Sequence, residues 1–212
     1  MKEYKVIIWD FNGTLIDDIH AALASVNDML TRRNQDIIDF STYSKAVDTP
    51  IWKFYEAVFI KGSITPEEAV KEFNEGYDKH LRENPLMEGA KEMLSYFQSL
   101  HKHQLIVSAS NINKVRKSLE ALGISEYFTE VLAMSDYNAG DKTFLAREYL
   151  EKNTISPSDA VVIGDCVFDF RMAQEIGADA ILNTRGHQAR TELSEIGVPI
   201  IDDLAELKDF IK

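Results

Sequence analysis

Short apolar segments alternate with amphipathic segments over most of the chain. Six runs are apolar, partly β-branched and bounded by turns or charges, of which the third is the weakest: residues 4–9, 104–108, 130–134, 160–163, 179–182 and 198–201. Each has the length of a strand. Continuous apolarity is typical of a parallel sheet that is covered on both faces.

Helical patterns fall between these runs. Residues 89–101 place Ala90, Met93, Leu94 and Phe97 on one helix face. Five further segments fit helices: 111–122, 143–152, 168–176, 189–196 and 203–211. The alternation from residue 86 onward predicts right-handed βαβ crossovers. We therefore expect an α/β fold with a Rossmann-like open parallel sheet and helices on both of its faces.

Residues 15–85 do not alternate in this way. They contain successive amphipathic helical patterns over residues 20–33, 41–59 and 66–81, with breaks near Asp48-Thr49-Pro50 and Asn84-Pro85. We predict an α/β core of residues 1–14 and 86–212 and a helical domain of residues 15–85 inserted after the first strand. Four aromatic side chains are expected in the core of that insertion: Trp52, Phe54, Tyr55 and Phe59.

The composition narrows the classes of partner. The 212 residues are 45% hydrophobic, so a sizeable core can form, and the formal net charge is −12. This acidity argues against a nucleic acid or an anionic membrane surface, which require clustered Lys and Arg. A small anionic substrate needs only a local pocket of donors. We expect a monomer or a homodimer.

The lone cysteine and the lack of long apolar runs bear on location. Cys166 has no partner for an intramolecular disulfide, and we interpret it as a small buried thiol. No apolar run reaches the length of a transmembrane helix or a signal-peptide core. We therefore expect a cytoplasmic protein.

Polar residues follow four of the predicted strands or begin the helices after them. Because ligands bind beyond the carboxyl ends of parallel strands, these residues are candidates for a common site. They are Asp10, Asn12, Gly13 and Thr14; Ser108, Ala109, Ser110 and Asn111; Lys142; and Asp165 and Asp169. Taken singly, each group fits a plain turn, a helix cap or a solvated lysine.

Together these residues form a coherent electrostatic site. The carboxylates of Asp10, Asp165 and Asp169 would repel one another unless a cation lay between them, and Mg²⁺ takes oxygen ligands of this kind. Lys142 adds a second positive charge, while Ser108 and nearby backbone N–H groups can bind phosphate. The arrangement predicts a phosphoryl-binding site with an aspartate placed to attack it.

The order of these motifs resembles that of the haloacid dehalogenase-like hydrolase superfamily over nearly the whole chain. The family motif DxDGT matches DFNGT except at Asn12, and the later Ser or Thr, the Lys and GDxxxD match Ser108, Lys142 and GDCVFD. The helical insertion is similar to the C1 cap of the phosphoglycolate phosphatase and β-phosphoglucomutase branch. The resemblance also implies a tight turn and a small β-hairpin flap after the first motif, with Gly13 at the bend.

The resemblance implies a role for each residue. Asp10 becomes the nucleophile that forms an aspartyl phosphate, and Lys142 balances its charge. The phosphate-binding set is then Thr14, Ser108, Ala109, Asn111 and Lys142. The Mg²⁺ set is Asp10, the main-chain carbonyl of Asn12, Asp165 and, in support, Asp169.

Asn12 is the departure from the family pattern. The family's aspartate at this place protonates the leaving oxygen and then activates water, and a neutral amide can do neither. General acid–base catalysis is typically worth about 10²–10⁴-fold. We therefore expect a site that binds phosphate and Mg²⁺ but hydrolyses slowly, so that Asn12 limits catalysis.

Four functional hypotheses follow. The first is a Mg²⁺-dependent phosphatase for a small phosphorylated metabolite; the second is a phosphotransferase or phosphomutase; the third is a non-catalytic phosphate-binding protein. The fourth, a phospho-accepting receiver domain, is disfavoured by the long helical insertion and the distant GDxxxD motif. Dehalogenase chemistry needs no Mg²⁺, so the GDCVFD motif disfavours it. His187 is interpreted as part of a solvated loop, and residues 48–53 are assigned loosely to a substrate-reading loop.

Overall fold

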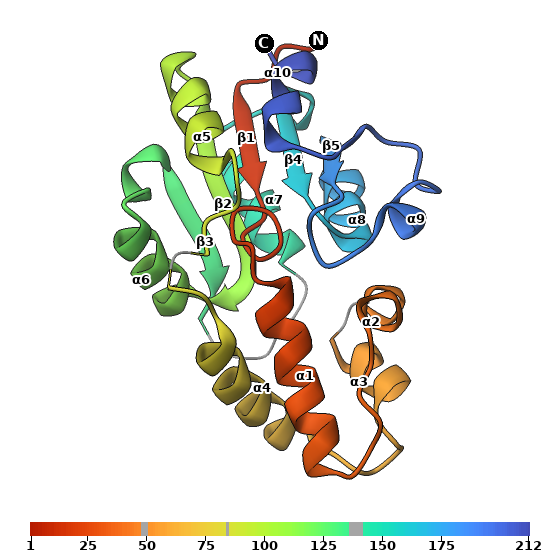
Figure 1. The fold of residues 1–212 in the computed structure, drawn as a ribbon. Helices are drawn as coiled ribbons and strands as arrows, with labels where there is room; N and C mark the ends of the chain where they lie inside the picture. The colour runs from red at the N-terminus through yellow and green to blue at the C-terminus, as the bar shows by residue number, and fades with distance from the viewer. Residues whose placement is uncertain (48–50, 84, 136–141) are drawn as a thin grey trace.

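The core of the protein is a six-stranded parallel sheet with the strand order β3-β2-β1-β4-β5-β6 in the computed structural model (Figure 1). The structure describes residues 1–47, 51–83, 85–135 and 142–212. The strands are β1 (Val6–Trp9), β2 (His103–Asn111), β3 (Glu130–Met134), β4 (Ala160–Gly164), β5 (Asp179–Asn183) and β6 (Ile200–Ile201). All six predicted strands are therefore present, and the order reverses direction beside β1, which places ligand-binding loops at its carboxyl end.

Both faces of the sheet are covered by helices, as the continuous apolar strands predict. Ile7 and Trp9 of β1 pack in a cluster with Phe97 of α5 (Ala90–Ser99), while Val6 and Ile8 belong to a second cluster on the opposite face. The first face is also covered by α6 (Ile112–Leu122) and α10 (Leu207–Phe210). The second face is covered by α7 (Thr143–Lys152) and α8 (Val167–Ile176). The α/β class is thereby confirmed.

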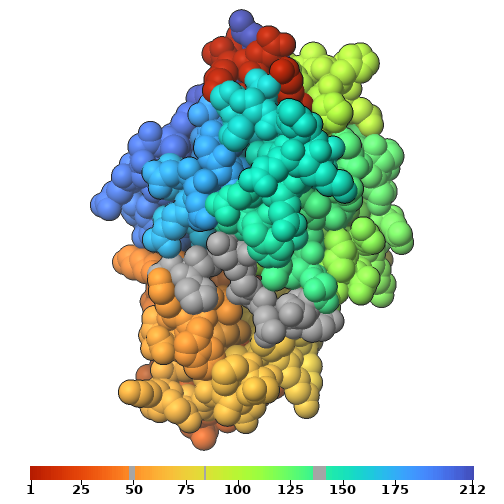
Figure 2. Space-filling view, turned by 180° about the vertical axis from the view of Figure 1, so that it is seen from behind, coloured from red at the N-terminus to blue at the C-terminus, as the bar shows by residue number. Residues whose placement is uncertain are grey.

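Among the described residues, the first four of the five helices between β1 and β2 form the helical insertion, which lies beyond the carboxyl ends of the strands (Figure 1). They are α1 (Ile19–Arg32), α2 (Phe40–Ala46), α3 (Trp52–Val58) and α4 (Pro66–His80). In the space-filling view the insertion is the lower lobe of the molecule (Figure 2).

The insertion has a hydrophobic cluster of its own, drawn only from residues 22–77. Phe54, Tyr55 and Phe59 are buried in it and Trp52 packs against it, as the sequence predicts. An Arg33–Glu72 ion pair at 2.8 Å adds a polar contact between the end of α1 and α4. The exact division of the chain into two domains stays a prediction.

Several segments differ from their predicted form. The pattern over residues 41–59 forms two helices, α2 and α3, and the helix predicted at 189–196 is the short α9 (Arg190–Leu193). Residues 203–211 divide into a 3₁₀ turn, Leu204–Glu206, and α10. Asp48-Thr49-Pro50 and Asn84 lie outside the described residues, and so does the start of the GDKTF segment. Pro85 is described, and its carbonyl accepts a hydrogen bond from Asp17 N at 2.6 Å.

The turn after β1 is present, but a hairpin of paired strands is not found among the described residues. Instead, single bridges join Asn12 to Ile16 and Ile16 to Leu86. Gly13 has φ +76°, which glycine adopts without strain, and its N–H donates to Ile16 O at 2.9 Å. The predicted flap is therefore a tight loop. No helix in the described ranges is long and apolar enough to cross a membrane.

Candidate active site

Asp10 stands directly after the fully buried strand β1. Its backbone N–H donates to Ile163 O of β4 at 2.8 Å, so the ladder between β1 and β4 fixes its position. The side chain is buried, with 6% exposure. Burial raises the pKa of Asp10 to about 8, against the opposing charge of Lys142, and the nearby carboxylates of Asp169 and Asp165 raise it further.

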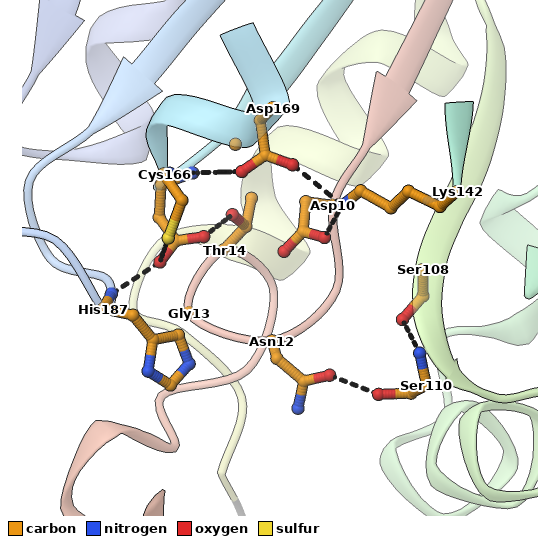
Figure 3. A network of polar contacts seen from close by, with 12 residues as sticks. Asp10, Asn12, Gly13, Thr14, Ser108, Ser110, Lys142, Cys166, Asp169 and His187 are labelled. Atoms are coloured by element: carbon orange, nitrogen blue, oxygen red, sulfur yellow. Dashed lines mark hydrogen bonds and ion pairs between the residues drawn. The ribbon is translucent and has the colours of Figure 1, made fainter. Parts of the chain in front are cut away.

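Lys142 bridges two of the carboxylates (Figure 3). Its Nζ contacts Asp10 Oδ1 and lies 2.8 Å from Asp169 Oδ1. Burial disfavours the charged ammonium, but the two carboxylates outweigh it and the pKa of Lys142 lies above its usual value. Lys142 directly precedes the first residue of α7, as the sequence predicts. A buried cation thus neutralises part of the negative charge.

Asp165 and Asp169 lie around the amino end of α8. Asp169 Oδ2 accepts hydrogen bonds from the N–H groups of Asp165 and Cys166, at 3.2 and 3.1 Å, which explains the spacing of the GDxxxD motif. Asp165 Oδ2 accepts from His187 N at 2.5 Å, and Thr14 Oγ1 donates to Asp165 Oδ1 at 3.4 Å. Burial raises the pKa of Asp165 to about 6, although the His187 charge opposes this.

Glycines allow the backbone to approach these two carboxylates closely. A Cβ on Gly13 would lie 2.4 Å from Asp165 Oδ2, and one on Gly186 would lie 2.1 Å from Asp165 Cβ. Likewise, a Cβ on Gly164 would lie 2.3 Å from Asp169 Cβ. These separations are impossible for another residue, so the loop after β1 reaches Asp165 only because residue 13 is glycine.

The donor set fits a hard divalent cation. Asp165, Cys166 and Asp169 have ligand atoms within 4.8 Å of one another. Asp10 lies close enough that the charges of Asp169 and Asp165 help to raise its pKa. The thiol is not a competing ligand: it is buried as predicted, its Sγ donates to Asp165 Oδ2 at 3.3 Å, and burial raises the pKa of Cys166 well above its usual value. Carboxylate and carbonyl oxygens therefore remain, and Mg²⁺ prefers such ligands.

The predicted phosphate-binding residues of β2 divide into two groups. Ser108 is buried, and its Oγ accepts from Ser110 N at 3.0 Å. The pairing of β2 with β3 shifts between Ser108 and Asn111, so Ala109 and Ser110 form a bulge near the site. Asn111 instead caps α6: its side chain accepts from the Asn113 backbone at 3.0 Å and donates to Ser135 O at 3.3 Å.

The Asn12 side chain uses both ends of its amide. Its Oδ1 accepts from Ser110 Oγ at 2.7 Å (Figure 3). Its Nδ2 donates to Asp18 Oδ2 at 2.7 Å and to Tyr77 OH at 3.0 Å. The amide thus joins β2 of the core to α4 of the insertion. A carboxylate at this position could accept from Ser110 but could not donate to Asp18.

Asp18, Tyr77 and His187 were not identified from the sequence as site residues, and the solvated-loop interpretation of His187 is wrong. The His187 side chain is only 13% exposed, and its Nε2 lies 3.3 Å from Asp18 Oδ1. Burial favours neutral His187, but Asp18 outweighs it and raises the pKa of His187 to about 9. Burial likewise opposes ionisation of Asp18, yet His187 and hydrogen bonds from Tyr77 and Asn12 hold its pKa below the usual value.

No local pattern signals this group, because its three members come from three separate parts of the chain. The nearest signal is the second acid of Asp17-Asp18, shortly after the first motif. Tyr77 OH donates to Asp18 Oδ2 at 2.7 Å, which completes a partly buried polar network with Asn12 and His187.

The fold and the site define a protein of the α/β class with an acidic centre in which a buried lysine bridges two carboxylates. Residues 7–182 match the family model described as haloacid dehalogenase-like hydrolase. The chain therefore belongs to the haloacid dehalogenase-like hydrolase family.

Individual relatives agree with this assignment. The chain is 26% identical over 229 aligned residues to a phosphoglycolate phosphatase of Photobacterium profundum, covering 100% of this chain and 99% of the relative. Among solved structures, a haloacid dehalogenase-like hydrolase family protein from Streptococcus pneumoniae matches with a TM-score of 0.84 at 19% identity, over 99% of both chains. A predicted phosphoglycolate phosphatase from Haemophilus somnus 129pt matches with a TM-score of 0.76 at 19% identity, also over 99% of both chains. The two structures show a shared fold.

Proposed function

We propose that this protein is a Mg²⁺-dependent phosphatase that hydrolyses a small phosphorylated metabolite through an aspartyl phosphate on Asp10. The observation that carries the proposal is the buried contact of Lys142 with both Asp10 and Asp169 at the carboxyl edge of the sheet. Such a preorganised charge arrangement suits a phosphoryl group, whose transfer depends mainly on positioning and electrostatic stabilisation.

Asp10, Asp165 and the main-chain carbonyl of Asn12 would hold Mg²⁺, with Asp169 in support. When bound, the cation neutralises the carboxylates and draws charge from the phosphoryl oxygens. Lys142 remains beside the nucleophile and offsets the charge of the incoming phosphate. Thr14 and Ser108 supply hydroxyl groups at the same sheet edge.

The reaction has two displacements. A carboxylate oxygen of Asp10 forms a bond to phosphorus while the bond to the ester oxygen breaks, and the leaving alkoxide takes a proton from solvent water. A water molecule then forms a bond to phosphorus and releases a proton to solvent, the bond to Asp10 breaks, and inorganic phosphate leaves with the carboxylate restored. Asn12 cannot supply the first proton or accept the second, so both steps should be slow for poor leaving groups.

The buried position of the site suits a small substrate. Asp10 and Lys142 are 6% and 5% exposed, and the helical insertion lies over the carboxyl edge of the sheet. We propose that the insertion acts as a cap that must move for substrate to enter. The phosphoglycolate phosphatase of P. profundum makes phosphoglycolate the first compound to assay.

A second candidate function is phosphoryl transfer to an alcohol. The Asn12 amide is committed to Asp18 and Tyr77, so water activation at this position is unavailable and an aspartyl phosphate would persist. An added alcohol could then compete with water.

The test is phosphate release from a panel of metabolites and one aryl phosphate, with Mg²⁺ and with a chelator. We expect Mg²⁺-dependent turnover that Asp10→Asn abolishes. Equal turnover by Asp10→Asn would contradict the proposal. Transfer to glycerol in excess of hydrolysis would favour the phosphotransferase.

A further inference from the structure

Two consecutive residues after β5 each contact the metal motif on one side and helix α2 of the insertion on the other. Gln188 Oε1 accepts from Val167 N, at the first turn of α8, at 2.7 Å. Its Nε2 donates to Val47 O, at the end of α2, at 3.0 Å. Gln188 is only 5% exposed, and both of its hydrogen bonds are partly buried.

His187 makes the same kind of double contact. Its backbone N–H donates to Asp165 Oδ2 at 2.5 Å, and its ring Nδ1 lies 2.9 Å from Tyr43 OH of α2. The two rings also pack, with centroids 5.9 Å apart.

Ser44 of α2 completes the contact. Its Oγ accepts from Ala189 N at 2.7 Å and donates to Glu192 Oε2 at 2.9 Å. The residue has 0% exposure, and its hydrogen bond with Ala189 joins it to the segment that contacts the metal motif. Residues 187–189 are thus held between α2 and the amino end of α8.

We propose that residues 187–189 couple the docked position of α2 to divalent-cation binding at Asp165, so that the bound cation and the docked helix stabilise each other. The proposal rests on the proposed function for the identity of Asp165 as a ligand. Gln188 and Ser44 are positioning residues in this scheme, since neither contacts Asp10 or the reacting phosphate.

The physical basis is the cost of ordering residues 187–189. When α2 is undocked, they lose their contacts with Tyr43, Ser44 and Val47, and the loop gains conformational freedom. Cation binding at Asp165 must then also supply the free energy that orders this loop, so the cation binds less tightly. Linkage requires the reverse effect to have equal size: a bound cation favours the docked helix.

Ser44→Ala tests this coupling. The substitution removes only contacts between α2 and the core. The matched control is Ser25→Ala, which removes a buried serine bond inside the insertion, from Ser25 Oγ to Phe73 O at 2.8 Å. A second variant, Tyr43→Phe, removes the hydroxyl contact with His187 and keeps the ring.

Two measurements are needed, neither of which depends on activity. Calorimetric titration with Mg²⁺ should show a dissociation constant about 5-fold or more higher for Ser44→Ala than for the native protein, within the usual range of coupling between sites. Tyr43→Phe should shift it in the same direction, and Ser25→Ala should not. In hydrogen exchange, Mg²⁺ should slow exchange of residues 40–46 in the native protein, and less so in Ser44→Ala.

The outcomes separate the coupling from the proposed function. Equal Mg²⁺ affinity in native protein, Ser44→Ala and Tyr43→Phe would overturn the coupling alone. An equal loss of affinity in Ser25→Ala would also overturn it, because the effect would then follow from general destabilisation of the insertion. Absence of Mg²⁺ binding by the native protein would overturn both the coupling and the proposed metal site. Mg²⁺ binding with the expected shifts but without phosphatase activity would leave the coupling in place and refute the function.

Discussion

Exchange of Asn12 for aspartate would place a second carboxylate against Asp18. The Asn12 Nδ2 atom that it replaces lies 2.7 Å from Asp18 Oδ2. Two unit charges about 4 Å apart repel by about 4 kcal/mol at an effective dielectric constant of about 20. This repulsion corresponds to a rise of about 3 units in the pKa of the new carboxyl group. The pKa of the new carboxyl group should therefore lie at about 7, so that at neutral pH about half of the molecules hold a proton there that can be donated to a leaving oxygen.

Three variants separate this effect from simple restoration of an acid: Asn12→Asp, Asp18→Asn and the double variant Asn12→Asp/Asp18→Asn. In the double variant an amide at position 18 can donate to the new carboxylate, so the pKa of that group should return toward the usual range. Asp10→Asn in each background removes the nucleophile and serves as the inactive control.

The assay is steady-state hydrolysis of one alkyl and one aryl phosphate across pH with saturating Mg²⁺. Asn12→Asp should raise alkyl turnover by about 10²-fold or more, within the range of general acid–base catalysis. The gain on the aryl ester should be smaller, because its first displacement needs little proton assistance and only its second displacement is slowed by Asn12. The descending limb of the alkyl pH profile should lie about 3 pH units higher in Asn12→Asp than in the double variant.

Two results would refute this reasoning. If the native protein is already fast on the alkyl ester and Asn12→Asp gains nothing, another group supplies the proton. If Asn12→Asp and the double variant have the same pH profile, Asp18 does not control the acidity of residue 12.

Four further predictions concern stability and metal affinity. The hydrogen bond from Arg33 lowers the pKa of Glu72 below its usual value of 4.5. The ion pair therefore stabilises the fold fully above pH 4.5, and this stabilisation is lost as the pH falls through the lowered pKa. Urea unfolding should show Glu72→Gln about 1 kcal/mol less stable at pH 7, with a gap that narrows below pH 4.5; a constant gap would contradict the assignment. Lys142→Met should lower stability without Mg²⁺ by about 3–5 kcal/mol, because two carboxylates lose their buried cation, and thermal melts should show partial recovery with Mg²⁺ but not with Na⁺. Gly13→Ala should raise the Mg²⁺ dissociation constant by about 10-fold or more in calorimetry, whereas Gly62→Ala, at a similar φ of +79° but with nothing within 4 Å of the new Cβ, should leave it unchanged. Phe97→Ala should destabilise the fully buried core by about 3–5 kcal/mol in urea unfolding. A loss below about 1 kcal/mol would show that neighbouring side chains repack into the cavity left by Phe97.

The sheet and its helices were predictable because each is encoded locally. Continuous apolar strands such as 160–163 can be stable only between two helix layers, and the alternation then limits the topology. Asp10, Lys142, Asp165 and Asp169 could be brought together for the same reason, since the carboxyl ends of parallel strands share one edge.

The rest of the site depends on contacts between distant segments. Asn111 follows a strand and begins a helix, so phosphate binding and helix capping predict the same residue there, and the structure shows capping. His187 and Asp18 are far apart in the sequence and meet only through the tertiary fold. Nothing in the sequence around His187 or Asp18 distinguishes a buried ion pair from a solvated loop.

Covalent phosphorylation of Asp10 tests the central claim most directly. Native protein mixed with an aryl phosphate and Mg²⁺, quenched in acid and digested, should yield the peptide of Asp10 with one added phosphoryl group. Hydroxylamine should remove the group, as it does from acyl phosphates, and Asp10→Asn or a chelator should prevent its formation. Because Asn12 cannot activate water, the labelled fraction should persist after substrate is exhausted. Steady turnover of the same ester with no label on Asp10 at any time would contradict the account.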